Sequence, residues 1–322
     1  MSGLVKQLNQ NDLAQYNLPV FAMEFYLSSI STNFGWLGNE DFLISYYIKR
    51  KWGVKILIFT SAPFKKTKFP KKSELDFIEK CLKIINTQLK VDYIQRPPTN
   101  VFFNSFPNNS QKMPFGSYVI NLDSSEEEIF SKFHSKHRNV IRKSIKDGLE
   151  IKKSNSFDNK VCNLINETLF RQNLPKLKFD YIKNIDQSHV LFSSIYKNGE
   201  IQGAAIFFWS IYGAYYMYGG SIERPHTGAM NLLHWECIKF FKLKGVKKYD
   251  FVGARDIVNE GSKIKGIQRF KERFGGEKKM GFLWKKKLSL KGHIYEFLIR
   301  VKSLSLKIDI IDEYEKKDFF NF

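Results

Sequence analysis

The stretch that decides the fold is residues 229–253, AMNLLHWECIKFFKLKGVKKYDFVG. Apolar side chains cover nearly every face of the helix expected over 229–244, and only a few lysines are left for solvent. Gly245 follows, and glycine suits the left-handed conformation at a helix end. Residues 248–252 place Asp250 on the face opposite Tyr249 and Phe251, as a strand does. The stretch therefore predicts a central, sheet-covered helix followed by a strand.

Working outward, one order of elements occurs twice. Strand, strand, strand, helix and strand are predicted at 190–196, 201–209, 215–219, 229–244 and 248–252. The same series is predicted earlier, at 35–40, 42–49, 55–60, 73–88 and 91–95. The earlier helix begins with a capping-box-like Ser73-Glu74-Leu75-Asp76. Two copies of one architecture are implied.

Other elements surround the two copies. A strand is predicted at 118–122, and two short helices are predicted after it. Glu126, Glu127 and Glu128 lie in the first turn of the first of these helices, where acids are favourable. A helix over 264–274, a strand over 279–287 and a C-terminal amphipathic helix come after the second copy. That last helix carries Ile294, Phe297, Leu298, Val301 and Leu304.

The uncharged stretch between Glu200 and Glu223 is long enough to cross a bilayer. Its aromatic residues and the break at Tyr212-Gly213 favour a buried hairpin of two strands instead. No transmembrane segment is expected.

Composition limits the partners and the compartment. The 322 residues are 43% hydrophobic, which excludes a disordered chain, and the net charge of +20 favours a polyanionic partner: nucleic acid, an anionic lipid surface or a phosphorylated substrate. Cys81, Cys162 and Cys237 form no close pair of the kind that holds zinc or forms a redox dithiol, so a reducing compartment is expected. Cys162 and Cys237 have no local base and are expected in the core. No leader-like start is seen, and a cytoplasmic location is expected.

The densest cationic segment is residues 132–146, which contains no acid. Arg138, Arg142 and Lys146 recur at intervals of four on the expected helix, a stack that suits phosphates; a solvated basic face is the alternative. His134 and His137 lie among these cations without a carboxylate or thiolate, so metal ligation is not expected.

Three further segments carry candidate chemistry. The loop 224–229 precedes a helix and could cradle a pyrophosphate, or it is a plain turn. Asp250 could accept a proton from an attacking amine, or cap a helix or pair with a cation. Lys271 lies at the edge of the apolar stripe of the 264–274 helix, where its stem can pack while its ammonium reaches a cleft, and Arg273 adds to a second cationic surface.

Three motifs in order and spacing resemble the FemABX-type peptidoglycan aminoacyltransferases, relatives of the GNAT superfamily. They are HRNVIRKSIKDGL at 137–149, YDFVG at 249–253 and GIQRFKERFGG at 266–276, and the similarity spans roughly residues 20–290. The long coiled-coil arm of some members is missing here, because no heptad run occurs.

The resemblance implies an α/β (α+β) fold of two GNAT-like domains, each a mixed sheet flanked by helices. The first would be 1–111, completed by the C-terminal helix 290–322, and the second would be 112–289, which carries the motifs. It also implies that no functional coenzyme A loop and no bound cofactor are present, aminoacyl-tRNA being the co-substrate. Phe270 and Lys271 would lie at the transfer site.

The expected function is an N-acyltransferase that moves an amino acid from aminoacyl-tRNA to an amine of a peptidoglycan or other cell-surface polymer precursor. The acceptor would be an anionic precursor, lipid-linked or soluble, and the enzyme would make a peripheral contact at the inner membrane face. Arg138, Arg142 and Arg171 are expected to contact phosphate or carboxylate groups, Tyr218 to line the acceptor channel, and Phe270 and Arg273 to bind substrate. Lys271 would stabilise the oxyanion, and Asp250 would accept a proton.

Two other functions remain open from the sequence. One is an acyl-coenzyme A dependent N-acyltransferase acting on an amino sugar of a surface glycan. The other is a non-catalytic tRNA-binding or nucleic-acid-binding protein that has kept the GNAT fold.

Overall fold

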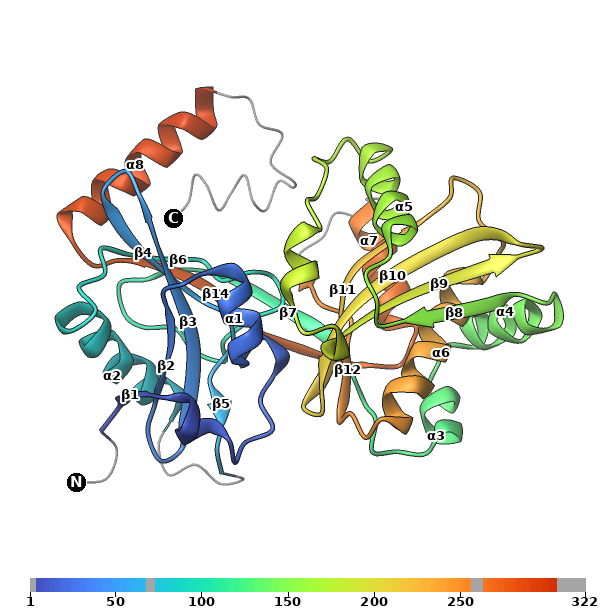
Figure 1. Ribbon diagram of the computed structural model, residues 1–322, viewed down its shortest axis with the longest axis horizontal. Coiled ribbons are helices and arrows are strands. Elements are labelled where there is room, and N and C mark those ends of the chain that lie inside the picture. The colour runs from blue at the N-terminus through green and yellow to red at the C-terminus, as the bar shows by residue number, and fades with distance from the viewer. Residues whose placement is uncertain (1–3, 68–72, 256–262, 306–322) are drawn as a thin grey trace. The chain divides into compact units, whose positions relative to one another are not determined.

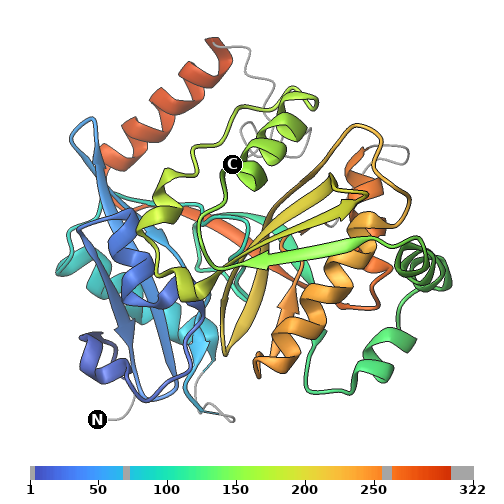
Figure 2. The same cartoon turned by 45° about the vertical axis from the view of Figure 1, so that its right-hand side comes forward.

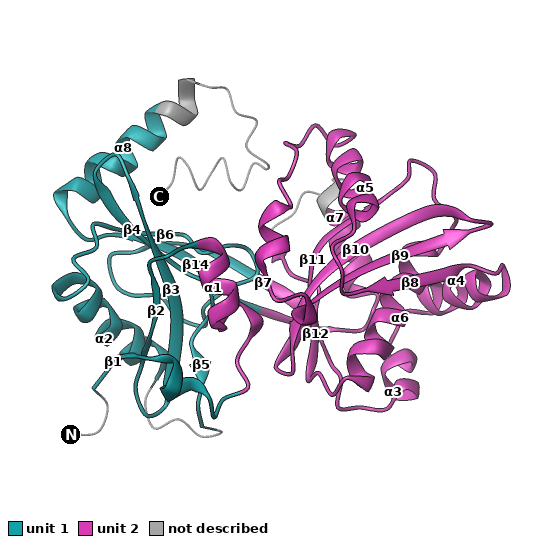
Figure 3. Ribbon diagram, viewed as in Figure 1, with its two compact units in different colours: residues 1–16, 31–115, 280–322 teal, residues 17–30, 116–279 magenta. Residues whose placement is uncertain are grey.

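The computed structural model describes residues 4–67, 73–255 and 263–305 of the chain (Figure 1). The chain divides into two compact units, shown in Figure 3. Unit 1 comprises residues 1–16, 31–115 and 280–322, and unit 2 comprises 17–30 and 116–279. The sequence placed the boundaries at 111/112 and 289/290 and gave residues 17–30 to the first domain. That segment belongs to unit 2 because Phe21 packs against Phe208 and Tyr215 there.

Unit 1 is built on a sheet in the order β1-β2-β3-β4-β6-β14. Its strands are β1 (Lys6–Leu8), β2 (Phe34–Gly38), β3 (Phe42–Lys51), β4 (Val54–Phe59), β6 (Tyr93–Gln95) and most of β14 (Glu277–Lys287), with β5 (Phe64–Lys65) beside β3. Its helices are η1 (Gln10–Leu13), α2 (Glu74–Thr87) and α8 (Leu290–Ser305). β2, β3 and β4 are antiparallel, and β6 is parallel to β4.

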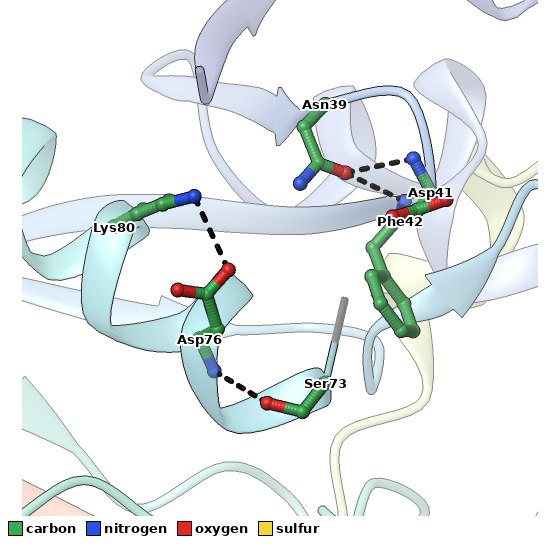
Figure 4. A network of polar contacts seen from close by, with 6 residues as sticks. All are labelled: Asn39, Asp41, Phe42, Ser73, Asp76 and Lys80. Carbon is green, nitrogen blue, oxygen red and sulfur yellow. Dashed lines mark hydrogen bonds and ion pairs between the residues drawn. The ribbon is translucent and has the colours of Figure 1, made fainter. Parts of the chain in front are cut away.

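Short side-chain contacts fix the β2–β3 turn and the start of α2 (Figure 4). The side-chain oxygen of Asn39 accepts from the backbone N–H groups of Asp41 at 2.9 Å and Phe42 at 2.8 Å. Ser73 caps α2 by accepting from the backbone N–H of Asp76 at 3.1 Å, as its capping-box-like sequence predicts. The Asp76 carboxylate also lies 3.2 Å from the Lys80 ammonium, a pair one helical turn apart.

Unit 2 is built on a sheet in the order β7-β12-β11-β10-β9-β8. Its strands are the later part of β7 (Gln111–Asn121), β8 (Glu150–Ser154), β9 (Val190–Lys197), β10 (Glu200–Ser210), β11 (Gly213–Ser221) and β12 (Lys248–Asp250), with β13 (Ala254–Arg255) beside β7. Its helices are η2 (Val20–Ala22), α1 (Glu24–Ile30), α3 (Glu126–Ser131), α4 (Ser135–Lys146), α5 (Asn159–Phe170), η3 (Asp180–Asn184), η4 (Gln187–His189), α6 (Ala229–Leu243) and α7 (Lys263–Glu272). β9, β10 and β11 are antiparallel, and β12 is parallel to β11.

The sheet of unit 2 is covered on both faces, with α6 on one and α5 on the other (Figure 2). Alternating side chains of one strand enter both cores: Phe207 joins the α6 side, while Ile206 and Phe208 join the α5 side. The nearly all-apolar sequence of α6 follows from this central position, as the sequence predicts.

The predicted fold class and the repeated order of elements are confirmed. In each unit three antiparallel strands lead into a helix, and the next strand is parallel to the third. The uncharged stretch forms the β10–β11 hairpin, also as predicted. Within the described ranges, no helix combines the length and hydropathy that a bilayer crossing requires.

Candidate active site in unit 2

The centre of the candidate site is the turn that follows β12. Val252 and Gly253 both adopt left-handed backbone conformations, with φ of +50° and +79°. The ammonium of Lys271, on α7, donates to the carbonyl oxygens of Val252 and Gly253, the latter at 3.0 Å. The structure thus brings Lys271 to the end of the strand that carries Asp250, although the two are twenty-one positions apart in sequence.

Asp250 also binds this turn, but it accepts a hydrogen bond from a backbone N–H, whereas Lys271 donates to backbone carbonyls. Its Oδ1 accepts from the backbone N–H of Val252 at 2.9 Å and from the hydroxyl of Ser117, on β7. Asp250 is buried. We name Ser117, Asp250, Val252, Gly253 and Lys271 the turn cluster.

The turn cluster stores backbone strain. A β-branched residue with positive φ is a genuine outlier, and residues held in such regions cost on the order of 1–3 kcal/mol. At Val252 this conformation persists because its N–H is bound by Asp250 and its C=O by Lys271. Strain that neighbouring groups maintain in this way is typical of functional sites.

The electrostatics of Lys271 suit oxyanion stabilisation. Burial lowers the pKa of Lys271 from 10.5 to about 8, and the charge of Asp250 partly opposes that shift. Within the described residues, two of the three ammonium protons go to carbonyl oxygens, which leaves one for a substrate. A cation outside bulk water can stabilise developing negative charge without reorganisation at the moment of reaction.

Phe270 precedes Lys271 on α7, and its ring lies close to the rings of two histidines. Its ring centroid lies 5.3 Å from that of His137, on α4, and 5.5 Å from that of His234, on α6. His234 is fully buried, and its Nδ1 lies 2.6 Å from the Tyr249 hydroxyl. Burial, reinforced by the charge of Lys271, lowers the pKa of His234 to about 3, and burial likewise lowers that of His137 to about 4. Both rings are therefore neutral at physiological pH.

Sequence reasoning missed Ser117 and His234. A histidine on a helix that is otherwise apolar was the available signal for His234, because a buried polar group needs a specific partner. Ser117 carried no such signal, since it meets Asp250 only through the pairing of β7 with β12.

The arginines of α4 make contacts within the protein. The Arg138 guanidinium donates to the carbonyl oxygens of Ser131, at 2.9 Å, and Phe133, which ties α4 to the end of α3. Arg142 lies over the Phe130 ring at 5.4 Å. The exposed cations of this segment are instead Lys132, Lys136, Lys143 and Lys146, together with Arg142. Phosphate binding by Arg138 and Arg142 stays a prediction.

The remaining predicted site residues lie at three places. Tyr218, on β11, joins the α5-side core, where its hydroxyl is 2.8 Å from that of Tyr181. Arg171 ends α5 and donates to Thr168 at 3.1 Å and to the carbonyl of Ser221. Arg273 contributes its carbonyl oxygen to the backbone N–H of His134 at 2.8 Å. The structure therefore brings together Asp250, Phe270 and Lys271, and it does not bring Arg171 into the turn cluster.

The surroundings of the cysteines disfavour a nucleophilic role. All three are buried and unpaired, which confirms the core prediction for Cys162 and Cys237. Burial raises the pKa of Cys162 to about 11 and that of Cys237 to about 12, so the reactive thiolate is scarce at neutral pH. Among the residues the structure describes, no group of histidine, cysteine and acidic side chains could hold a metal ion.

Residues of α4 pack closely against the loop 224–229. Gly228 caps α6 with φ of +89°, and a Cβ added there would lie 2.7 Å from the carbonyl oxygen of Val140 and 2.6 Å from the hydroxyl of Ser144. The imidazole of His226 lies 2.9 Å from the Asp147 carboxylate. Protein atoms therefore crowd the start of α6, the place where a helix N-terminus would receive a pyrophosphate.

Comparisons with known proteins agree with this architecture. Residues 188–285 match the model of the FemAB family. They contain β9 to β12, α6, α7 and every residue of the turn cluster except Ser117. No curated protein sequence matches the chain significantly.

Solved structures share the fold at low sequence identity. The crystal structure of FemX is 12% identical, with 91% of this chain and 99% of that chain covered and a TM-score of 0.66. The C-terminal domain of a putative lysylphosphatidylglycerol synthetase from Agrobacterium fabrum is 14% identical, with 84% and 89% covered and a TM-score of 0.51. L-PGS from Bacillus licheniformis is 13% identical, with 88% and 91% covered and a TM-score of 0.51.

The class of protein follows from these findings: a FemABX-type fold whose second unit carries the family segment. The chain is similar to the FemABX-type family, as its motifs indicated.

Proposed function

We propose that the protein transfers an amino acid from aminoacyl-tRNA to an amine of a peptidoglycan or other cell-surface polymer precursor, in the cytoplasm. The observation that carries this proposal is the buried Lys271 ammonium, held by the carbonyls of a strained turn next to Phe270. The FemAB match covers these residues, and a fixed cation can stabilise the oxyanion that develops during aminoacyl transfer.

In the proposed reaction, a neutral acceptor amine attacks the ester carbonyl carbon of the aminoacyl-tRNA. A C–N bond forms, and the carbonyl oxygen becomes an oxyanion that the Lys271 ammonium stabilises. The intermediate then expels the ribose oxygen. The proton lost by the amine passes to the Asp250 carboxylate or, with assistance from the substrate, to the departing ribose oxygen.

The crowding of the loop 224–229 favours aminoacyl-tRNA over acyl-coenzyme A as the donor. The α6 N-terminus is crowded by Val140 and Ser144, whereas an acyl-coenzyme A dependent enzyme would need that place for a pyrophosphate. The net charge of +20 supports capture of a nucleic acid, because each cation that meets a phosphate releases counterions.

One protein of similar structure is named a putative lysylphosphatidylglycerol synthetase. The product in that name is a phospholipid that carries an amino acid. This supports the inclusion of lipid-linked acceptors beside soluble cell-wall precursors. Contacts of Arg138, Arg142, Arg171, Tyr218 and Arg273 with these substrates belong to the same proposal.

A two-donor assay tests the proposal. The protein is incubated with tRNA charged with one labelled amino acid at a time, or with labelled acetyl-coenzyme A, over one panel of soluble and lipid-linked amine acceptors. We expect an amide product from charged tRNA alone. Product from acetyl-coenzyme A alone would identify the glycan acyltransferase instead, and tight tRNA binding without consumption of any charged tRNA would favour the non-catalytic alternative.

A further inference from the structure

α8 turns an apolar face to solvent. The side chains of Leu290, Ile294, Phe297, Leu298 and Val301 are between 45% and 77% exposed. At the helical repeat these positions fall within one arc, so they form a continuous stripe, which we name the α8 stripe. The helix is amphipathic as predicted, but its apolar side faces outward.

The buried side of α8 holds the helix in this orientation. The Glu296 carboxylate lies 2.8 Å from the Lys285 ammonium and 3.2 Å from that of Lys287. Beside it, Tyr295 is buried with its ring centroid 5.4 Å from that of Tyr93. Rolling the α8 stripe inward would separate this buried carboxylate from its cations, a change that is strongly unfavourable.

The exposed side of α8 is apolar and cationic. Glu296 is the only acid in residues 290–301, and it is paired on the buried side. Lys291 and Arg300 flank the stripe, and the Arg300 guanidinium also lies 3.6 Å from the Glu296 carboxylate. An apolar face bordered by cations is the pattern of a helix that lies in the interface of an anionic membrane.

An aromatic residue next to α8 extends this pattern. Trp52, at the tip of the β3–β4 hairpin, is 53% exposed, and its ring centroid lies 5.8 Å from that of Tyr295. The Lys51 ammonium lies 4.8 Å from the centre of the Trp52 ring. Tryptophan and lysine are residues that favour the boundary between acyl chains and head groups.

We infer that the α8 stripe and Trp52 form a docking surface for an anionic lipid bilayer. A second copy of the chain is a poorer occupant, because it would bring two sets of cations together. The inference deepens the proposed function, since it names the surface by which the enzyme meets the membrane that carries a lipid-linked acceptor. The binding itself does not require transfer activity.

The test is sedimentation of the full chain with phosphatidylcholine vesicles that contain about 30% phosphatidylglycerol, against pure phosphatidylcholine vesicles. We expect binding to the anionic vesicles, and at least a roughly tenfold loss of binding in the double variant Ile294→Asp, Phe297→Asp. The matched control is Phe170→Asp, because Phe170 is 81% exposed but lies on α5 of unit 2. Its binding should stay within about twofold of the parent.

Four results would overturn the inference. The first three are absence of binding by the full chain, equal binding by the double variant, and a dimer in solution that the double variant dissociates. The fourth is binding that begins only when residues 306–322 are removed, because that segment would then be the natural occupant. Transfer to a soluble acceptor, measured in the same variants, separates these failures from a failure of the proposed function.

Discussion

At the scale of single residues, the central feature is that Lys271 is fixed by backbone carbonyls. Side-chain carboxylates that pair with a lysine neutralise it, whereas carbonyl dipoles hold the ammonium and leave its charge available. Asp250 acts on the same turn through the N–H of Val252, so it contributes to the position of Lys271 as well as to the local charge.

The pH dependence of transfer should report Lys271. Since burial lowers its pKa to about 8, the ammonium loses its proton as pH rises through that value, and oxyanion stabilisation is lost. Single-turnover amide formation should therefore fall above about pH 8 in the parent. In Lys271→Arg this descending limb should move out of the range, because guanidinium stays protonated. A parent rate that keeps rising from pH 7 to beyond pH 9 would contradict this role.

His234 should make the protein sensitive to acid. Its pKa is about 3 in the folded state, whereas an unfolded histidine titrates near 6.5, so the unfolded state alone gains a proton as pH falls between these values. Stability contributed by the neutral ring is present above about pH 6.5 and is lost below it, by about 2 kcal/mol at pH 5.

Denaturant unfolding at pH 7 and pH 5 measures this effect. In His234→Gln, which can still bond to Tyr249, the loss between the two pH values should be about 2 kcal/mol smaller than in the parent. An identical loss in both proteins would show that His234 does not stay neutral on folding.

At the scale of elements, α4 lies against the start of α6, and a pair of glycines tests that packing. Gly228 has Val140 and Ser144 within 3 Å of an added Cβ, whereas Gly245, also with positive φ, has nothing within 4 Å. Gly245→Ala should cost about 1–2 kcal/mol of stability for the left-handed conformation alone. Gly228→Ala should cost about 1–3 kcal/mol more, because it also overpacks the contact.

The free energy of unfolding from denaturant titration measures both variants. Equal costs at the two glycines would mean that α4 is not seated on the loop, and it would reopen that site to a diphosphate.

Sequence patterns were a better guide to the order of the helices and strands than to the direction in which each element faces. The order of elements in both units followed from hydrophobic periodicity and turn residues, which are local signals. The orientation of α8 could not be predicted in this way. The buried Glu296 pairs with two lysines of β14, and no local sequence pattern indicates that pairing. β8 was also missed, since most of its side chains are exposed and it lacks an apolar run.

The site shows the same division between local and distant information. Asp250, Phe270 and Lys271 could be predicted as site residues because they stand in short motifs. The positive φ of Val252 and the contact of Ser117 with Asp250 depend on strand pairing between distant segments, which one sequence does not reveal.

At the scale of the whole molecule, the net charge of +20 includes a concentration of exposed cations on α4, and we expect this surface to bind tRNA. Lys143 and Lys146 are exposed on α4, so Lys143→Gln with Lys146→Gln should weaken tRNA binding and lower the slope of log affinity against log salt by about 1.5. The matched control removes the same charge from unit 1, with Lys83→Gln and Lys90→Gln, and should keep the parent slope.

Filter binding over a series of salt concentrations supplies both slopes. If the control pair lowered the slope as much as the α4 pair, attraction by total charge rather than a surface on α4 would explain the binding.

The most direct test of the account is single-turnover transfer from labelled aminoacyl-tRNA by the parent and by Lys271→Ala. We predict a loss on the order of 10²–10³ in the rate of amide formation, the effect expected when one preorganised oxyanion partner is removed. Binding of tRNA and the far-ultraviolet circular dichroism spectrum should stay unchanged. Near-normal amide formation by Lys271→Ala would contradict the account, because the turn cluster would then have no part in the reaction.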